Sequence, residues 1–501
     1  MADGEWKYGI RPAVEFHHAR GNRRTGNAML GKVCIIGAFP CISDKFERFT
    51  SWAEATKKLN IEIDKHDLPY IENSLGKYVK NDNVFDGAVA LRWAFMSGSN
   101  EPGATEVLVC NITTQKLATQ TADGKTVISG ACDNGNPIYN TTLTHDDIAV
   151  DNGLVADKDK LKVALSKLKT EDFDSIIFAY DLNKELSNYK MSASETGNKP
   201  VLTYIDANEK EATADTGMPK PIAERLIQLR NFTHDSYNVK NPIGLYIGIT
   251  VPPKDNESTT TIQNTGTGSV VDSIVETNKS KRINKDLAEK YLDIFKDPVH
   301  HAHSLYCMVF DGIKTDLRGY DLTPMETAAY ICGVESGLPV ETIMGQRTLP
   351  HMIGVPEELN YDPRFKSSTD EQNDGIHLLA HGATVFECTN RANNEWAIVN
   401  SRLPCGFDIS HLRTSAYIIK QIALTPFLCK INNDVTRESV DSVIASLKDR
   451  YVDRFTNVIS IDHHIADKRS PSCIEIYIYI NFWGIIINEC VYVAMGVEDD
   501  E

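Results

Sequence analysis

The sequence lacks the features of a disulfide framework, a zinc site or a membrane span. It has 11 cysteines, an odd number, and no two are spaced as Cys-x-x-Cys. Single thiols scattered through apolar stretches are typical of reduced cysteines in a cytosol. The longest apolar tract, 476–487, is interrupted by Asn481 and is shorter than the about 20 residues that cross a bilayer. The first residues have neither the basic region nor the apolar core of a secretory signal, so we expect a soluble protein that inserts in no membrane.

Positive charge is scarce. The chain has 52 Lys and Arg against 69 Asp and Glu, which gives a formal charge of -17. Such an acidic chain is a poor match for the phosphate backbone of a nucleic acid or for an anionic membrane. At 501 residues, with 42% hydrophobic and 24% charged residues, the length predicts about three domains and the composition a globular protein with a large core.

Catalytic motifs are also missing. The sequence contains no phosphate loop, no dinucleotide-binding glycine pattern and no nucleophile elbow. The cluster His300-His301-Ala302-His303 could hold a transition metal, but adjacent histidines point in different directions on a regular backbone. We therefore expect no cofactor and no enzyme activity.

The triplet Asp462-His463-His464 suggests an alternative function. It is similar to the motif of a class of two-metal phosphoesterases, so a metal-dependent phosphoesterase is the competing hypothesis. In those enzymes a long catalytic region follows the motif, whereas here the triplet lies near the carboxyl end of the chain. A polar turn between a helix and the terminal strands is the interpretation that we favour.

Strand and helix patterns alternate in the first half of the chain. Buried strands are predicted at 32–38, 106–110, 174–180 and 242–249, and helices at 51–59, 84–95 and 221–230. This alternation favours an α/β layer. Between 112 and 168 the dipeptides Asp123-Gly124 and Asn134-Gly135 predict hairpins in a β-rich insertion. The Ser/Thr/Asn/Gly-rich stretch from residue 257 predicts a mobile surface loop.

The carboxy-terminal third is dense in predicted elements. Thr323-Pro324-Met325-Glu326 predicts a capped helix that runs to Gly337. Further helices are predicted at 412–423 and, with a clear apolar face, at 436–454; strands are predicted at 396–402, 474–479 and 490–494.

The pattern of the amino-terminal segment, residues 1–24, predicts an extended arm. Apolar residues occupy every second position from Trp6 to Phe16, which is the period of a strand, and Pro12 suits a strand at a sheet edge. No hairpin partner follows, so this strand must pair elsewhere.

The order of these features resembles one family, the sheath proteins of contractile phage tails and related contractile injection systems. The amino-terminal match is Gly31 to Pro40 with the helices at Phe49–Ala55 and Ala90–Gly98. The later matches are listed in chain order: Thr323 to Gly333, Asn373 to Ile376, Trp396 to Leu403, Arg413 to Ile419, the helix from Thr436 and the closing strands. The run from Trp396 departs from the usual pattern of the family, and the terminal tract is unusually aromatic.

The resemblance implies a fold class of multidomain α+β or α/β type. Its core would be built from the amino- and carboxy-terminal parts, with a β-rich inserted outer domain and extended terminal arms. The implied division is an arm at 1–24, an α/β domain at 25–111 and 169–298 with a mobile loop at 257–281, the β-rich insertion at 112–168, a sheath core domain at 299–470 and terminal strands at 471–501.

The resemblance also implies a function and partners. A tail sheath subunit forms a helical homo-oligomer of stacked rings around an inner tail tube, meets baseplate and tail terminator proteins, and contracts to drive the tube through a target cell envelope. Such a protein would assemble in the host cytoplasm and reside in the virion. The sequence does not distinguish a viral tail from a cell-borne injection system, and a surface adhesin is a third hypothesis that the missing signal disfavours.

Two sets of site residues follow from the resemblance. Strand exchange between subunits would use an amino-terminal donor strand and a carboxy-terminal receiving sheet, comprising Tyr8, Ile10, Pro12, Val14, Ile474, Ile476, Ile478, Val491 and Val493. The long helix from Thr436 would face the tube through Arg437, Lys448, Arg450 and Arg454. A core-packing helix with a solvated face is the competing interpretation of this second set.

Overall fold

The structure is a computed structural model of the 501-residue chain. It describes residues 30–39, 46–59, 61, 63–64, 68–72, 74–75, 78–80, 86–96, 103–112, 116–121, 124–129, 132–133, 136–137, 158–183, 202–214, 216–238, 241–251, 253–255, 279–296, 305–317, 320–355, 378–390, 392–399, 403–404, 407–423, 434–452, 458–465 and 476–483. The chain divides into two units, Met1–Thr425 and Pro426–Glu501.

A mixed six-stranded sheet is the centre of the first unit. Its spatial order is β17-β14-β10-β1-β5-β2, with bounds Tyr306–Val309, Gly244–Gly248, Ser175–Ala179, Lys32–Gly37, Glu106–Asn111 and Glu47–Phe49. The first five strands are parallel, and β2 is antiparallel to β5 at the edge. The parallel strands follow the order 2-1-3-4-5 of a doubly wound fold, in which the order reverses between β1 and β10.

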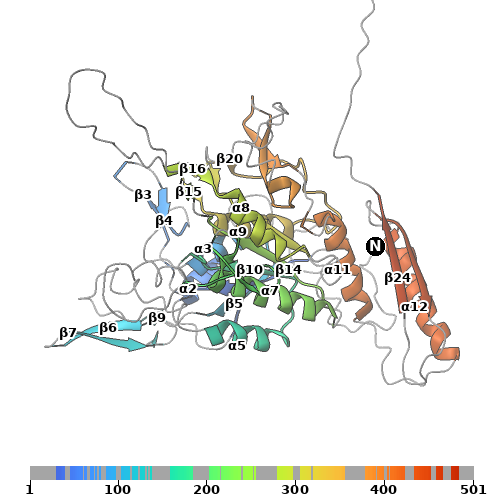
Figure 1. Ribbon diagram of the computed structural model, residues 1–501. Coiled ribbons are helices and arrows are strands. Elements are labelled where there is room, and N and C mark those ends of the chain that lie inside the picture. Colours follow the sequence, from blue (N-terminus) through green and yellow to red (C-terminus); the bar gives the residue numbers. More distant parts are fainter. Residues whose placement is uncertain are drawn as a thin grey trace, which may run out of the picture. The chain divides into compact units, whose positions relative to one another are not determined.

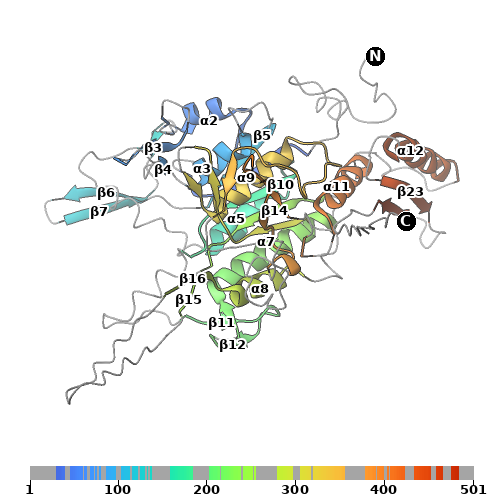
Figure 2. The same cartoon turned by 90° about the horizontal axis from the view of Figure 1, so that it is seen from above.

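Helices cover both faces of this sheet (Figure 2). On one side lie α2 (Trp52–Leu59), α3 (Asp86–Phe95) and α9 (Pro324–Ser336); on the other lie α5 (Lys158–Leu168), α7 (Lys220–Asn238) and α8 (Lys285–Asp293). Alternate strand residues feed two separate cores: Val33 and Ile35 join the first, whereas Cys34 and Ile36 join the second. Strands buried on both faces are continuous apolar runs, which is why the sequence reveals them.

Helix α9 lies at the centre of the first core and packs against α3 (Figure 1). Every residue of α9 after Pro324 is buried, so its sequence is apolar nearly all round, as expected of a helix with no solvent face. The predicted cap is confirmed. Thr323 is the N-cap, Pro324 occupies the first turn, and the helix ends at Gly337.

Most predicted elements of this unit are confirmed with shifted ends. Helix α7 has 19 residues where the sequence predicts ten, because His, Thr and Asp in its second half obscure the apolar stripe. Both hairpins of the 112–168 segment are present: β6 (Lys116–Thr121) pairs with β7 (Gly124–Ser129), and β8 (Cys132–Asp133) with β9 (Asn136–Pro137). The same segment ends in α5, which packs Leu161, Leu165 and Leu168 into the second core.

Small antiparallel sheets surround the central one. They comprise β11 (Tyr204–Ile205), β12 (Glu211–Ala212) and β13 (Met218–Pro219); β18 (Ile313–Thr315), β19 (Asp321–Leu322) and β20 (Met352–Gly354); and the pairs β3 (Tyr70–Glu72) with β4 (Tyr78–Lys80), β15 (Pro253–Asp255) with β16 (Lys279–Ile283), and β21 (Phe386–Asn390) with β22 (Glu395–Ile398). The predicted strand at 396–402 is β22, which ends at Ile398. Helix α11 (Ile409–Ala423) closes the unit.

The second unit contains one helix and one hairpin among its described residues. Helix α12 (Asp434–Val452) matches the predicted long helix, and β23 (Val458–Ile465) pairs with β24 (Ile476–Phe482). The arm at 1–24, the strand at 490–494, the histidine cluster at 300–303 and nearly all of the predicted loop at 257–281 lie outside the described residues. Over the part of the chain that is described, no helix is both long and apolar enough to cross a membrane.

Candidate functional site

The second unit holds the predicted site residues that the structure describes. Ile476 and Ile478 lie in β24, opposite Ile465 and His463 of β23. Arg437, Lys448 and Arg450 lie in α12. The remaining residues of both sets fall outside the described ranges: Tyr8, Ile10, Pro12, Val14, Arg454, Ile474, Val491 and Val493. The structure therefore locates part of each set and leaves its role a prediction.

Helix α12 packs against the β23–β24 hairpin. Val440 and Ile444 are the buried apolar residues of the helix, and Val458 and Ile461 are those of β23. The helix thus covers one face of the hairpin with a short apolar contact. Three large apolar side chains in and beside the hairpin remain largely exposed: Ile459 at 44%, Tyr479 at 56% and Trp483 at 59%.

The triplet Asp462-His463-His464 lies in β23, so its interpretation as a polar turn is wrong. Three polar residues in a row predict a turn, but the pairing of β23 with β24 uses backbone groups, and an edge strand tolerates charged side chains. Successive side chains of a strand point to opposite faces, which keeps the three from converging on one ion. No group of three or more His, Cys, Asp or Glu residues within the described ranges could hold a metal.

The triplet instead helps to fix α12 on the hairpin. The Lys448 ammonium donates to Asp462 Oδ1 at 3.1 Å, and His463 Nε2 lies 2.6 Å from Asp441 Oδ1. The hydrogen bond from Lys448, with a second from Ser460, holds the pKa of the Asp462 carboxyl below its ordinary value. One predicted tube-facing cation, Lys448, is therefore engaged within its own unit.

In the first unit, α3 packs beside the place where doubly wound folds bind ligands. That place is the crevice at the carboxyl ends of the strands where the strand order reverses. Here the Phe39 N–H donates to Asn111 Oδ1 at 3.2 Å, the Phe39 side chain is buried, and Gly87 N donates to Ala38 O at 3.1 Å. A Cβ at Gly87 would lie 2.5 Å from Ala38 O, so α3 sits directly on this end of the sheet.

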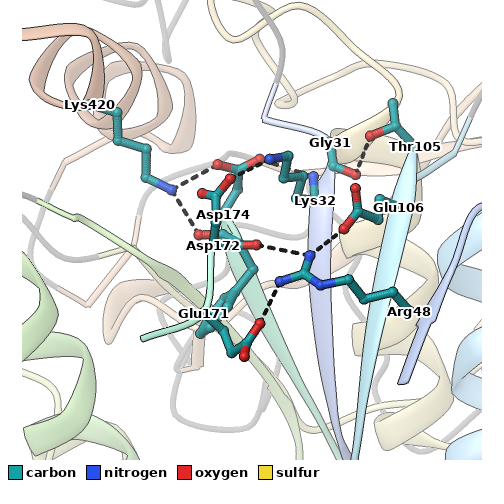
Figure 3. A network of polar contacts seen from close by, with 10 residues as sticks. Gly31, Lys32, Arg48, Thr105, Glu106, Glu171, Asp172, Asp174 and Lys420 are labelled. Atoms are coloured by element: carbon teal, nitrogen blue, oxygen red, sulfur yellow. Dashed lines mark hydrogen bonds and ion pairs between the residues drawn. The ribbon is translucent and has the colours of Figure 1, made fainter. Parts of the chain in front are cut away.

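The opposite, amino-terminal end of the sheet carries a network of charged residues (Figure 3). Asp174, which precedes β10, accepts from Lys32 N at 2.9 Å and from Lys420 Nζ at 2.7 Å. Lys420 also donates to Phe173 O at 2.9 Å. The Arg48 guanidinium bridges Glu106 and Glu171. The network joins β1, β2, β5, β10 and α11, which are far apart in sequence.

A second cation of α11, Arg413, docks on the carboxyl end of α9. Its guanidinium donates to Glu335 O, to Leu338 O at 3.0 Å and to Pro339 O at 3.4 Å. The side chain is buried. Glu335 O is one of the last carbonyls of α9, which have no i+4 donor within the helix, whereas Leu338 O and Pro339 O belong to the turn that follows it. Arg413 and Lys420 are seven residues apart, about two turns, so one face of α11 carries both contacts.

Sequence reasoning missed both cations of α11. Arg413 belongs to the run Arg413-Thr414-Ser415-Ala416, which is part of the family resemblance. Nothing in that run indicates that the Arg413 side chain binds the end of another helix. Lys420 falls in the last turn of a predicted helix, where a lysine ordinarily faces solvent. Their position in the helix is the one signal of burial: Arg413 and Lys420 both lie on the apolar side of α11.

Comparisons with known proteins give structural matches only. No family model matches the chain, and no curated protein matches it. Among solved structures, a chain from the anti-feeding prophage baseplate has 11% identity and a TM-score of 0.48, covering 96% of this chain and 98% of that one. The sheath complex of the extracellular contractile injection system PVC, in its contracted state, has 9% identity and a TM-score of 0.46, with 96% of each chain covered.

A third solved structure is a sheath tail protein from Desulfitobacterium hafniense. It has 9% identity and a TM-score of 0.44, covering 93% of this chain and 99% of that one. These three solved structures are therefore a chain of a baseplate, the sheath of a contractile injection system and a sheath tail protein.

Proposed function

We propose that this chain is a contractile sheath subunit, which forms a helical homo-oligomer of stacked rings around an inner tube and contracts to drive that tube through a target envelope. The observation that carries the proposal is the two-stranded sheet of the second unit. In the described residues, β23 and β24 pair only with each other. A lone two-stranded sheet is marginally stable in water and leaves a row of main-chain donors and acceptors at each edge.

A strand supplied by another copy would complete this sheet. The segment from Trp6 to Phe16 has the alternation of a strand and no hairpin partner next to it. Tyr8, Ile10, Pro12 and Val14 are the proposed donor residues; Ile474, Ile476, Ile478, Val491 and Val493 are the proposed receivers. Exposed Tyr479 and Trp483 beside the open edges support this pairing, because an added strand and its flanks would remove them from water.

In the proposed sheath, α12 lies on the side that faces the tube. Arg437, Lys448, Arg450 and Arg454 would offer cations to an acidic or polar tube surface, with Lys448 first released from Asp462. Baseplate and terminator proteins would bind the ends of the polymer. When each subunit binds the next head to tail and the rotation between neighbours does not close a ring, the subunits form an open helix. One repeated contact is therefore enough to build the polymer.

Electron microscopy of purified protein tests the proposal. The full chain should form striated tubes, with some wide and short, whereas a chain lacking residues 1–20 should stay a folded monomer. Ile10→Pro removes one main-chain donor from the arm and should shorten or abolish tubes; Ile10→Val keeps the donor and is the matched control. Normal tubes from the truncated chain would refute strand exchange.

A further inference from the structure

A small cavity lies between α11 and the amino-terminal end of the sheet. Its polar wall includes Asp174, Ser175, Glu335, Ser336 and Arg413. Glu335 stands in the last turn of α9 and is 1% exposed. The Tyr246 hydroxyl donates to Glu335 Oε2, while Oε1 is buried and has no hydrogen-bond partner in the described structure. One oxygen of a buried carboxyl is therefore left unsatisfied at the cavity.

The surroundings of Glu335 disfavour a negative charge there. The carboxyl lies at the carboxyl end of α9, where the helix dipole is itself negative. Arg413 is the nearest cation, but its N–H groups are directed to the main-chain carbonyls of Glu335, Leu338 and Pro339. The other titratable groups around it supply no cation: they are Tyr246 from β14, Cys307 from β17, Cys332 from α9, Asp408 ahead of α11, and Asp174, which Lys420 already pairs.

We propose that the Glu335 carboxyl is a proton-binding site that controls how firmly α11 is docked on the sheet. A proton on Oε1 makes the group neutral and gives the unsatisfied oxygen a hydrogen to place in the cavity. Loss of that proton to solvent leaves a buried anion, which is relieved when α11 lifts and water enters. The inference concerns the single chain and does not depend on the proposed function.

Burial supports this mechanism, since it raises the pKa of Glu335 from the ordinary 4.5 to about 7, against the opposing effect of Arg413. Such a carboxyl binds its proton about 300-fold more tightly in the folded chain than in the unfolded one. The folded state holds the extra proton between these two pKa values. Stability from this group is therefore fully present below pH 4.5, falls as the pH rises toward about 7, and is constant above.

Urea unfolding of the full chain between pH 5.5 and 8.5 measures this effect. The folding equilibrium constant of the wild type should fall by about 30-fold, the part of the change that lies above pH 5.5. Glu335→Gln, which is neutral at every pH, should remove that fall. Glu326→Gln is the matched control, because Glu326 is equally buried in α9 but receives hydrogen bonds at both oxygens; it should keep the wild-type slope. Parallel slopes for Glu335→Gln and wild type would overturn the proposal.

Hydrogen exchange shows whether α11 is the element that responds. Protection factors of α11 amides should drop from pH 6 to pH 8.5 in the wild type and stay level in Glu335→Gln, whereas α7 amides that exchange through local openings should be unchanged in both. An equal drop at those locally exchanging α7 amides would contradict a local effect. If Glu335→Gln does not fold, an infrared difference spectrum of the wild type decides the matter: a buried protonated carboxyl that disappears near pH 7 supports the site, and its absence at pH 5.5 refutes it.

Discussion

The two ends of helix α9 are both buried and are stabilised by different means. At the amino end, Glu326 accepts from Thr323 N and from the Tyr320 hydroxyl, both at 2.8 Å, and Thr323 Oγ1 accepts from Glu326 N. At the carboxyl end, the last carbonyls accept from Gly337 N and Leu338 N and, at Glu335 O, from the Arg413 guanidinium as well; the Glu335 carboxyl is only partly satisfied. A carboxylate suits the first end and opposes the dipole of the second.

This difference shows which contacts of a helix end can be predicted from nearby residues and which cannot. The amino-terminal cap uses partners within six residues, so a four-residue motif predicts it. At the carboxyl end, the local bonds from Gly337 N and Leu338 N are supplemented by the guanidinium of Arg413, 78 positions away from Glu335. We therefore expect the first end to contribute a local, modest stabilisation, and the second to depend on the whole first unit being folded.

The largest expected effect comes from removing the distant cap. Arg413→Ala removes a charged donor from three main-chain carbonyls and opens space beside Glu335. Glu335 O keeps its bond from Leu338 N, and Pro339 O keeps its bond from Thr342 N. Hydrogen bonds from a charged group contribute about 1.5–3 kcal/mol each and are not fully additive, so we expect a loss of about 3–5 kcal/mol in the free energy of unfolding. Urea unfolding measures it. A loss below about 1 kcal/mol would mean that the two ends of α9 are equally self-sufficient.

The amino end should be sensitive to its close contact with the sheet. A Cβ on Gly248 would lie 1.9 Å from Pro324 O, so Gly248→Ala must push α9 off β14. We expect a loss of about 2–3 kcal/mol, as for other overpacked cores, measured by thermal or urea unfolding. Gly354→Ala is the matched control, because its Cβ would lie 3.4 Å from a flexible lysine side chain. Equal stabilities would show that the first turn of α9 can move.

The smallest expected effect comes from the local cap. Thr323→Ala removes the acceptor for Glu326 N and should cost about 1 kcal/mol. Thr323→Ser keeps the hydroxyl and should cost less than half of that. If Thr323→Ala destabilises the protein as much as Arg413→Ala does, the contrast between the local and the distant cap is lost.

The same contrast explains how much of the fold the sequence predicted. The buried strands β1, β5, β10 and β14 and the capped start of α9 follow from short patterns, and they are confirmed. The sequence does not predict α5, because the periodicity of its Lys-rich stretch is weak and follows directly on the hairpins. The polar triplet at Asp462 predicts a turn where the structure has a strand, because edge strands accept polar residues.

The candidate site was less predictable than the fold. Short patterns found the helix and the hairpin of the second unit, whereas Lys448–Asp462, Asp441–His463 and the partners of Lys420 and Arg413 depend on residues 14 to 246 positions apart. Composition and periodicity hold no record of such pairings. Distances of this kind are set by tertiary packing alone.

The bond between Lys420 and Asp174 also sets an order of events during synthesis. It spans 246 residues, and Asp174 in turn binds the backbone of Lys32, 142 residues earlier. Contacts of such high sequence separation form late and slowly. The amino-terminal end of the sheet is complete only when the chain has been made through α11, so a nascent chain finishes its first unit just before the second emerges. A subunit that joins others through its second unit would then be withheld from assembly until the rest of it can fold.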